Sequence, residues 1–331
     1  MKNVAIFGAG RIGRIHASNL AALPGVELRY VCDPVVVAAA DLAQQHNARV
    51  VEVDAVLADP SIDVVAIASS TDTHSDLITR AAAAGKHIFC EKPVDMSVPR
   101  ARACADAVQA AGVACMIGFQ RRFDPTFNEA RTRMDRGDIG NPEMLIITSR
   151  DPGAPPAAYI QASGGIFRDM LIHDFDVFRW ILCADGDAAQ WISATGSVLT
   201  DPSIRALGDM DSTAVTIRTR QGRLCQINTS RRAAYGYDQR FELLGSKGML
   251  QCGNHAPSEV VQSDATGVRR DKPENFFLQR YSTAYRLEIT HFFECLQTGA
   301  PFRTTIADGV AAQVLADAAA QSCQSGQPVT L

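Results

Sequence analysis

The segment from residue 164 to 180 combines three ionisable side chains with a pattern that otherwise indicates a buried helix: GGIFRDMLIHDFDVFRW. Asp169, His173 and Asp176 are spaced i, i+4 and i+7, which predicts one polar stripe along that helix. A buried carboxylate or imidazole is costly unless it is paired or used. A carboxylate one turn from a histidine orients the ring and supports its charged form, so this pair could act as a general base.

Two other interpretations of this segment need weighing. His173, Asp174 and Asp176 could ligate a metal, but they are crowded along one helix and no second His or Cys lies nearby. We therefore expect no metal site. A core histidine that is satisfied by a neighbouring aspartate stays open as a purely structural interpretation.

Lys92, in the sequence CEKPV, is a second candidate for chemistry. It follows a short apolar run that ends near Phe89, and Pro93 restricts it to extended geometry. A lysine fixed at the end of a strand could donate to a hydroxyl or carbonyl oxygen. A solvated surface lysine is the alternative.

A glycine motif, G-x-G-x-x-G, occurs in VAIFGAGRIGRIHA directly after the first apolar run. Gly8 permits a tight turn, Gly10 lets the backbone approach a pyrophosphate, and Gly13 allows close packing of helix on strand. The helix that begins at Arg11 and Ile12 would offer its amides to the phosphates. The motif predicts a dinucleotide site, and we interpret His16 as a packed residue of this first helix.

Asp33 ends the second apolar run, about 20 residues after the glycine motif. A carboxylate there accepts hydrogen bonds from the adenosine ribose and repels a 2′-phosphate. No Arg or Lys occurs at positions 34–40 to hold such a phosphate, which favours NAD over NADP. Asp33 could also serve as the N-cap of a helix with Pro34 in its first position, and both roles are compatible.

The loops ASSTDTH and CEKP follow later strands and should border the same crevice. For His74, helix capping is favoured over cofactor contact. The further cofactor-binding candidates in these two loops are Ser69, Thr71, His74, Glu91 and Lys92.

Alternation of short β runs with alanine-rich helical stretches in the first 120 residues predicts a doubly wound parallel sheet. The expected strands are 4–7, 28–31, 64–68, 87–89 and 113–117. Beyond residue 120 we expect one helix around 169–180, then β runs joined by hairpin turns at QGR and GSKG, then helices at about 280–298 and 306–323. The fold class is α/β, with a Rossmann domain over 1–120 and an α+β domain with an open, mostly antiparallel sheet over 121–331.

Composition narrows the class of protein. The chain has 331 residues, is 47% hydrophobic and carries a net charge of −4 without a basic block, so neither nucleic acid nor a membrane surface is an expected partner. No apolar run reaches the roughly 18 residues that span a bilayer. The N-terminus enters a strand at once, which leaves no room for a signal peptide, and nine scattered cysteines suit a reducing compartment. We expect a cytoplasmic protein.

Five motifs, in this order along the chain, resemble the glucose-fructose oxidoreductase/inositol dehydrogenase (Gfo/Idh/MocA) family: GAGRIGRIHA, CEKP, GFQRRFDPTF, GGIFRDMLIHDFDVFRW and YGYDQRFELLGSKGML. The first two are common to the family. The IHDFD and YGYDQR blocks are more specific and resemble its bacterial inositol dehydrogenase branch. The resemblance implies NAD as cofactor, an α/β substrate domain, and a homotetramer formed through the open sheet.

The resemblance also implies roles for individual residues. Lys92 would hold the reacting hydroxyl, His173 would be the general acid/base, and Asp169 would be its partner and a substrate ligand. The peptide bond between Lys92 and Pro93 would be cis. The ring hydroxyls of the substrate would be bound by Asp176, Arg122 and Tyr235.

The expected reaction is therefore NAD-dependent oxidation of a secondary hydroxyl of a cyclic polyol, with myo-inositol giving the 2-keto product. Scyllo-inositol or a glucose-type pyranose is the nearest alternative substrate, because Gln120 and Arg168 depart from the residues common in the family. An NAD-assisted glycosidase or lyase and a non-catalytic NAD-binding sensor are the alternatives of other classes.

Overall fold

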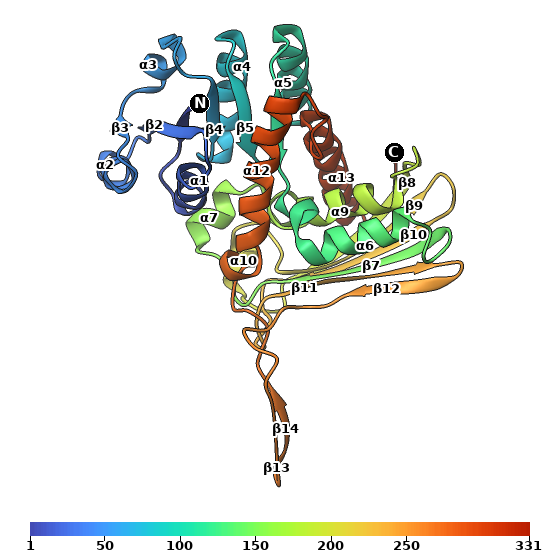
Figure 1. Ribbon diagram of the computed structural model, residues 1–331. Coiled ribbons are helices and arrows are strands. Elements are labelled where there is room, and N and C mark those ends of the chain that lie inside the picture. Colours follow the sequence, from blue (N-terminus) through green and yellow to red (C-terminus); the bar gives the residue numbers. More distant parts are fainter. The chain divides into compact units, whose positions relative to one another are not determined.

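The computed structural model describes residues 1–331, which form two compact units (Figure 1). The first comprises Met1–Phe123 with Ala284–Gln313, and the second Asp124–Thr283 with Val314–Leu331. This division differs from the expected boundary at residue 120, because the segment 284–313 belongs with the first unit. The reason is packing: the ring of Phe292 contacts that of Phe89 at 6.0 Å between centroids, and Tyr285 contacts His16 at 5.7 Å.

The first unit is built on a sheet of six parallel strands in the order β3-β2-β1-β4-β5-β6. The strands are β1 (Lys2–Phe7), β2 (Val26–Cys32), β3 (Arg49–Val50), β4 (Val64–Ile67), β5 (His87–Glu91) and β6 (Cys115–Gly118). The residues of β4 and β6 are buried throughout, as expected for strands covered on both faces. The predicted doubly wound sheet is confirmed.

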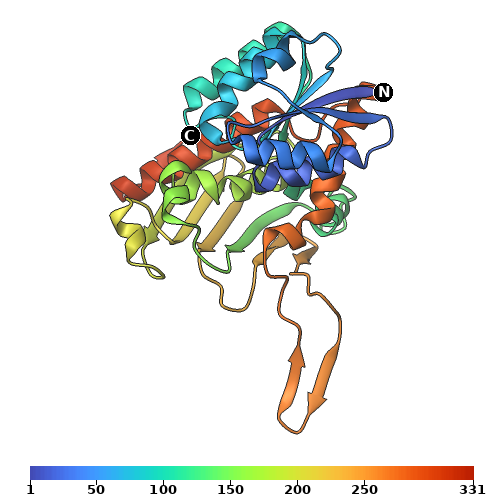
Figure 2. The ribbon, with the colours of Figure 1, turned by 90° about the vertical axis from the view of Figure 1, so that its left-hand side faces the viewer.

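Helices cover both faces of this sheet, with α1 and α2 on one side and α4 and α5 on the other (Figure 2). The helical elements of the unit are α1 (Arg11–Ala21), α2 (Val36–Gln45), α3 (Val53–Ala58), α4 (Thr71–Ala83), α5 (Val98–Ala111), the 3₁₀ turn η1 (Gln120–Phe123), α12 (Ser282–Thr298) and the first part of α13 (Ile306–Ser325). Gly85 follows the C-cap residue Ala84 of α4 with a φ of +69°, the left-handed conformation in which glycine commonly ends a helix.

The second unit is built on a seven-stranded sheet in the order β12-β11-β7-β10-β9-β8-β15. Only β7 and β10 run parallel, so the expected mostly antiparallel sheet is confirmed. Its strands are β7 (Pro142–Arg150), β8 (Ala189–Ser197), β9 (Ser212–Thr219), β10 (Leu224–Ser230), β11 (Asp238–Gly245), β12 (Gly248–Cys252) and β15 (Val329–Thr330). The pairings β9–β10 and β11–β12 confirm the hairpins expected at QGR and GSKG.

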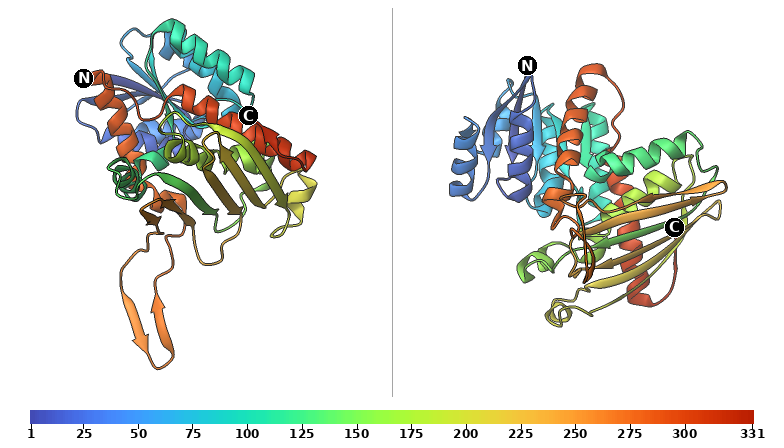
Figure 3. Two further views of the ribbon diagram at one scale, coloured as in Figure 1. Left: turned by 90° about the vertical axis from the view of Figure 1, so that its right-hand side faces the viewer. Right: turned by 60° about the horizontal axis from the view of Figure 1, so that its bottom comes forward.

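Helices cover one face of this sheet and leave the other without a helix (Figure 3). The core lies between the sheet and α6 (Pro125–Asp135), α9 (Ile172–Leu182) and the second part of α13. Alternate residues of β9 and β10 are buried in it, as a sheet packed on one side requires. The remaining elements are α7 (Ala157–Ala162), α8 (Ile166–Asp169), α10 (Ser203–Ala206), α11 (Phe277–Arg280) and the exposed hairpin of β13 (Val261–Asp264) and β14 (Gly267–Arg270). No helix of either unit combines the length and apolar character that crossing a membrane requires.

Candidate active site

The glycine loop joins β1 to α1, and its glycines serve different purposes. Gly8 has a φ of +106°, and a Cβ there would lie 2.4 Å from the carbonyl oxygen of Ala68. A Cβ on Gly13 would lie 2.0 Å from the carbonyl oxygen of Gly8. Both positions therefore require glycine for the fold itself.

Gly10 has no such structural reason to be glycine. Its φ is −71°, which any residue adopts, and a Cβ there would meet no atom within 4 Å. The open space lies at the N-terminus of α1, where Arg11 is exposed and Ile12 partly buried in the first turn. Because unpaired amides at a helix N-terminus bind anions, this space fits the approach of a dinucleotide phosphate.

Asp33 directly follows β2, and both of its carboxylate oxygens accept backbone hydrogen bonds. One accepts from the amide of Ala9 in the glycine loop at 2.6 Å, and the other from the amide of Val35 at 2.7 Å. Asp33 is not the N-cap of α2, since that helix begins at Val36 and its N-cap is Val35. The alternative with Pro34 in the first helical position is therefore wrong, and Asp33 instead fixes a turn beside the glycine loop.

The loop after β4 contributes Ser69, Thr71 and His74. The hydroxyls of Ser69 and Thr73 lie 2.6 Å apart, and Thr71 is the first residue of α4. His74 does not cap this helix: the N-cap is Ser70, and His74 is buried one turn inside. Burial lowers the pKa of His74, although hydrogen bonds to two carbonyls partly oppose this. The shorter bond, from Nδ1 to the carbonyl oxygen of Pro93, is 2.7 Å and anchors the loop after β5.

Lys92 stands directly after β5 and is partly buried. Its peptide bond to Pro93 is cis, as the family resemblance implies. The next residue, Val94, is buried, and its side chain lies where a Cβ on Gly309 would come within 2.6 Å. The backbone that carries Lys92 is thus held by His74 and by close packing against α13, which favours a fixed lysine over a freely solvated one.

Arg122 and Gln120 lie in the turn η1 and are buried. The guanidinium of Arg122 donates to the carbonyl oxygen of Arg303 at 2.7 Å and to the carboxylate of Asp308 at 3.1 Å. These contacts tie η1 to the segment before α13 and to the first turn of α13, inside the first unit. Arg122 therefore uses part of its N–H groups inside the protein, although the family resemblance assigns this side chain to the substrate.

The expected single helix around Asp169 is two helices. Helix α8 ends at Asp169 and α9 begins at Ile172, so Asp169 does not share one regular helix with His173 and Asp176. The reason is a wider turn, in which the amide of Leu171 donates to the carbonyl oxygen of Ile166, five residues back. The interpretation of the three side chains as one stripe of a regular helix at i, i+4 and i+7 is therefore wrong.

Asp169 is held by two residues that the sequence analysis did not identify. The hydroxyl of Tyr159 donates to one carboxylate oxygen at 2.8 Å, and the buried guanidinium of Arg231 lies 3.4 Å from the other. Arg231 also reaches Asp209 at 3.4 Å, and Asp209 accepts from the first amide of α8 at 2.9 Å. Asp169 therefore presents a carboxylate of fixed orientation. Tyr159 could have been noticed from its closeness in the chain, whereas Arg231 gives no local signal.

Helix α9 presents His173 and Asp176 differently. His173 is partly exposed, as a residue that exchanges protons with a ligand must be, whereas Asp174 and Asp176 are fully buried. The side chains of both aspartates therefore lie in the interior of this unit, whereas the sequence pattern placed Asp176 on a polar stripe beside His173.

Tyr235 and Arg168 lie elsewhere in the second unit. The hydroxyl of Tyr235 donates to Asp238 at 2.6 Å and accepts from Arg150 at 3.0 Å, with 41% of the residue exposed. The side chain of Arg168 donates to Asp317 at 2.7 Å, which ties α8 to α13.

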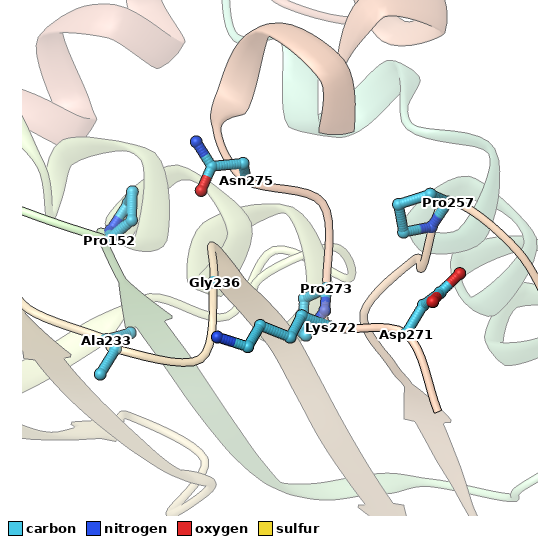
Figure 4. Close-up of a pocket in the computed structure, with 9 residues that line it drawn as sticks. Pro152, Ala233, Gly236, Pro257, Asp271, Lys272, Pro273 and Asn275 are labelled. Carbon is cyan, nitrogen blue, oxygen red and sulfur yellow. The ribbon is translucent and has the colours of Figure 1, made fainter. Parts of the chain in front are cut away.

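A surface pocket of about 540 Å³ lies in the second unit and is open to solvent (Figure 4). It is lined by Pro152, Ala233, Ala234, Gly236, Pro257, Asp271, Lys272, Pro273 and Asn275. None of these residues carries the chemistry assigned to His173 and Asp169, so we do not interpret the pocket as the catalytic centre.

Comparison with known proteins gives a match along nearly the whole chain. A family model described as "Oxidoreductase family, NAD-binding Rossmann fold" matches residues 2–119, and one described as "Oxidoreductase family, C-terminal alpha/beta domain" matches residues 131–331. The inositol 2-dehydrogenase of Rhizobium meliloti is 44% identical over 326 residues, which cover 98% of each chain.

Solved structures agree with this match. A myo-inositol dehydrogenase from Corynebacterium glutamicum superposes with a TM-score of 0.95 at 42% identity, covering 100% of this chain and 99% of the other. The scyllo-inositol dehydrogenase of Lactobacillus casei, solved with bound NAD(H) and scyllo-inositol, superposes with a TM-score of 0.93 at 27% identity and the same coverage.

Proposed function

The chain belongs to the Gfo/Idh/MocA oxidoreductase family, and we propose that it is an NAD-dependent dehydrogenase that oxidises a secondary hydroxyl of a cyclic polyol. The substrate we propose is myo-inositol, which would give the 2-keto-inositol scyllo-inosose. The observation that carries this proposal is the 44% identity to an inositol 2-dehydrogenase over 98% of both chains, which spans the glycine loop and the IHDFD block together.

NAD fits the residues of the first unit. The space at Gly10 and the amides that begin α1 suit the pyrophosphate, and Asp33 places a carboxylate beside the same loop for the ribose. When bound, NAD supplies the acceptor for the hydride that leaves the carbinol carbon.

Removal of that hydride requires that the hydroxyl proton also leave, and the chain's own residues supply this half of the reaction. In the proposal, Lys92 donates a hydrogen bond to the reacting oxygen and stabilises the negative charge that grows there. His173 accepts the proton, and Asp169 orients the imidazole and binds a neighbouring hydroxyl. The contacts of Tyr159 and Arg231 with Asp169 support this part, because they hold its carboxylate in one orientation.

Recognition of an uncharged polyol must rest on hydrogen bonds. Carboxylates accept from hydroxyls, whereas Lys and Arg side chains donate, so a mixed set can read adjacent hydroxyls in opposite senses. We retain Asp176, Arg122 and Tyr235 as ligands of the ring. A site of this kind disfavours a missing or inverted hydroxyl, because its own polar groups then lose their partners.

Scyllo-inositol is the second candidate substrate, favoured by the similarity to the Lactobacillus casei enzyme that was solved with that polyol. The deciding experiment measures NADH formation by the purified protein across myo-inositol, scyllo-inositol, other inositol epimers and glucose. The highest kcat/KM with myo-inositol supports the proposal. A higher kcat/KM with scyllo-inositol or a hexopyranose refutes the choice of substrate. Turnover of a glycoside without NADH accumulation indicates a glycosidase or lyase, and NAD binding without turnover indicates a sensor.

The family resemblance also leads us to propose a cytoplasmic homotetramer that assembles through the helix-free face of the seven-stranded sheet. That face exposes Arg218 on β9, Gln226 on the adjoining β10, and Arg240 on β11, which β7 separates from β10. Light scattering on the intact protein measures the mass, and a change of Gln226 to Trp should disrupt the assembly. A monomeric wild-type protein would refute this part.

A further inference from the structure

Three buried titratable side chains meet inside the first unit, behind the loop that carries Lys92. His16 lies on α1, Glu91 ends β5, and Glu288 lies in the middle of α12. Nε2 of His16 is 2.6 Å from a carboxylate oxygen of Glu91, and the nearest polar atoms of all three residues lie within 4.8 Å of one another. His16 and Glu288 are fully buried, and no N–H or O–H group donates a hydrogen bond to either carboxyl oxygen of Glu288.

The walls of this cluster are tightly packed. The ring of His16 meets Phe89 and Tyr285 edge-on, at 4.9 and 5.7 Å between centroids. Gly118 leaves room for Glu91, because a Cβ there would lie 3.1 Å from the carboxylate. Two ionised carboxylates in such surroundings would repel each other and lose their hydration, which costs far more than a buried neutral acid.

A bound metal ion does not fit this geometry. Two ligand atoms on a tetrahedral zinc ion lie roughly 3.3 Å apart, given zinc–nitrogen bonds of about 2.0–2.1 Å. The 2.6 Å separation between Nε2 of His16 and the carboxyl group of Glu91 is instead that of a hydrogen bond. No N–H or O–H group donates to Glu288 to offset a negative charge there, so a proton on Glu288 is the way to remove that charge.

We propose that Glu288 is held as a neutral acid and, with His16, fixes Glu91 so that the adjoining Lys92 is correctly placed for the reaction. Glu288 and His16 are thus positioning residues, and the inference rests on the proposed dehydrogenase function. Burial and the nearby Glu91 both raise the pKa of Glu288 well above its usual value, which agrees with a neutral acid.

The covalent structure transmits this effect. Glu91 and Lys92 are adjacent, and the carbonyl of Pro93 on the far side of Lys92 is already held by His74. The cluster therefore holds Glu91, the residue before Lys92, whereas His74 holds Pro93, the residue after it. Because α1 carries His16 and also begins at the glycine loop, the same cluster connects the cofactor helix with Lys92.

Two substitutions of similar size separate the proposal from simple packing. Glu288→Gln keeps a neutral group that can donate, and Glu288→Leu fills the space without any donor. We expect the Gln variant to keep kcat within about threefold and the Leu variant to lose about tenfold to a hundredfold, since a small misplacement of a catalytic group can cost that much. The KM for NAD should change little in both. Glu294→Gln, an exposed change on the same helix, is the matched control.

Further measurements identify the mechanism. In a Lys92→Ala background, Glu288→Leu should reduce kcat/KM no further, and the infrared carbonyl band of a protonated acid should be present in the wild type and absent in Glu288→Gln. The positioning role would be overturned if both variants kept wild-type activity, or if both lost activity equally. It would also be overturned if Glu288→Leu reduced kcat/KM as much in the Lys92→Ala background as it does in the wild type. If the wild-type protein held one metal ion per chain and Glu288→Gln lost it, the cluster would hold an ion where we propose a proton, and the proposal would be wrong.

Two readouts need no substrate, so they separate this inference from failure of the proposed function. They are the infrared band and the rate at which an amine-acetylating reagent modifies Lys92, followed by peptide mass spectrometry. Faster modification in Glu288→Leu but not in Glu288→Gln supports the positioning of Lys92 even if no polyol is oxidised. Unchanged rates in both variants would reject it.

Discussion

Replacement of Gly10 by Ala should impair cofactor binding while leaving the fold intact. The φ of Gly10 is −71° and its absent Cβ would meet no atom within 4 Å, so alanine fits without strain. Gly8 provides the contrast, because its φ is +106° and a Cβ there would lie 2.4 Å from the carbonyl oxygen of Ala68. The same chemical change at two positions in one loop therefore separates ligand binding from folding.

The expected magnitudes follow from these contacts. Gly10→Ala should change the free energy of unfolding by less than about 0.5 kcal/mol, as for other substitutions without strain. Hydrogen bonds to a charged group contribute about 1.5–3 kcal/mol, so loss of a phosphate contact should weaken NAD binding about tenfold to a hundredfold. In Gly8→Ala, the strained backbone alone costs roughly 1–3 kcal/mol, and the contact with Ala68 adds to this.

Thermal unfolding with and without NAD, together with calorimetric titration of NAD, measures both effects. Gly8→Ala should lower the Tm by several degrees, since about 1 kcal/mol corresponds to roughly 2–4 °C in a domain of this size. Gly10→Ala should keep the Tm of the free protein and lose most of the stabilisation that NAD gives. The reasoning fails if Gly10→Ala binds NAD as tightly as the wild type, or if it unfolds as early as Gly8→Ala.

Four further substitutions test the other assignments. His173→Ala should lower kcat by about 10²- to 10⁴-fold with NAD affinity unchanged, and a loss under about threefold in steady-state assays would return His173 to a structural role. Lys92→Arg should be nearly as inactive as Lys92→Ala, because a planar guanidinium does not replace a compact ammonium, and retention of most of the activity would contradict this. Asp33→Ser should raise the KM for NAD about tenfold to a hundredfold and shift preference toward NADP, and an unchanged ratio of the two kcat/KM values would limit Asp33 to its turn. Tyr159→Phe removes one donor to Asp169 and should reduce kcat/KM for the polyol by about threefold to tenfold, and an unaltered value would show that Arg231 alone fixes the carboxylate.

Much of the fold could be predicted because its signals are local. The glycine loop is one: the conformation of Gly8 and the contact between Gly8 and Gly13 involve residues close together in the chain, so the motif carries its own structural reasons. The hairpins at QGR and GSKG are likewise local, because turn residues lie between two β runs that pair with each other.

Local sequence patterns did not predict the backbone correctly where a helix is interrupted or begins late. The spacing of Asp169 and His173 is that of a regular helix, but the wide turn at Leu171 divides it, and periodicity does not register a single shifted hydrogen bond. Asp33 is similar, since its oxygens bind the amides of Ala9 and Val35 and the helix begins later than a Pro34 start predicts. In both cases the residue types could be interpreted from the sequence, but the path of the backbone could not be predicted from it.

Tertiary structure alone decided the polar partners of the candidate site residues. Arg231 reaches Asp169 across 62 residues of chain, and His16 reaches Glu91 across 75. Glu288 gave no sequence signal, because a single glutamate in a helix is ordinarily solvated, and only the folding of α12 against β5 places it in the interior beside Glu91. The sequence by itself determined which side chains are candidates for NAD binding and proton exchange, whereas burial and long-range contact decided which of them are held in place, because both arise only when distant elements pack together.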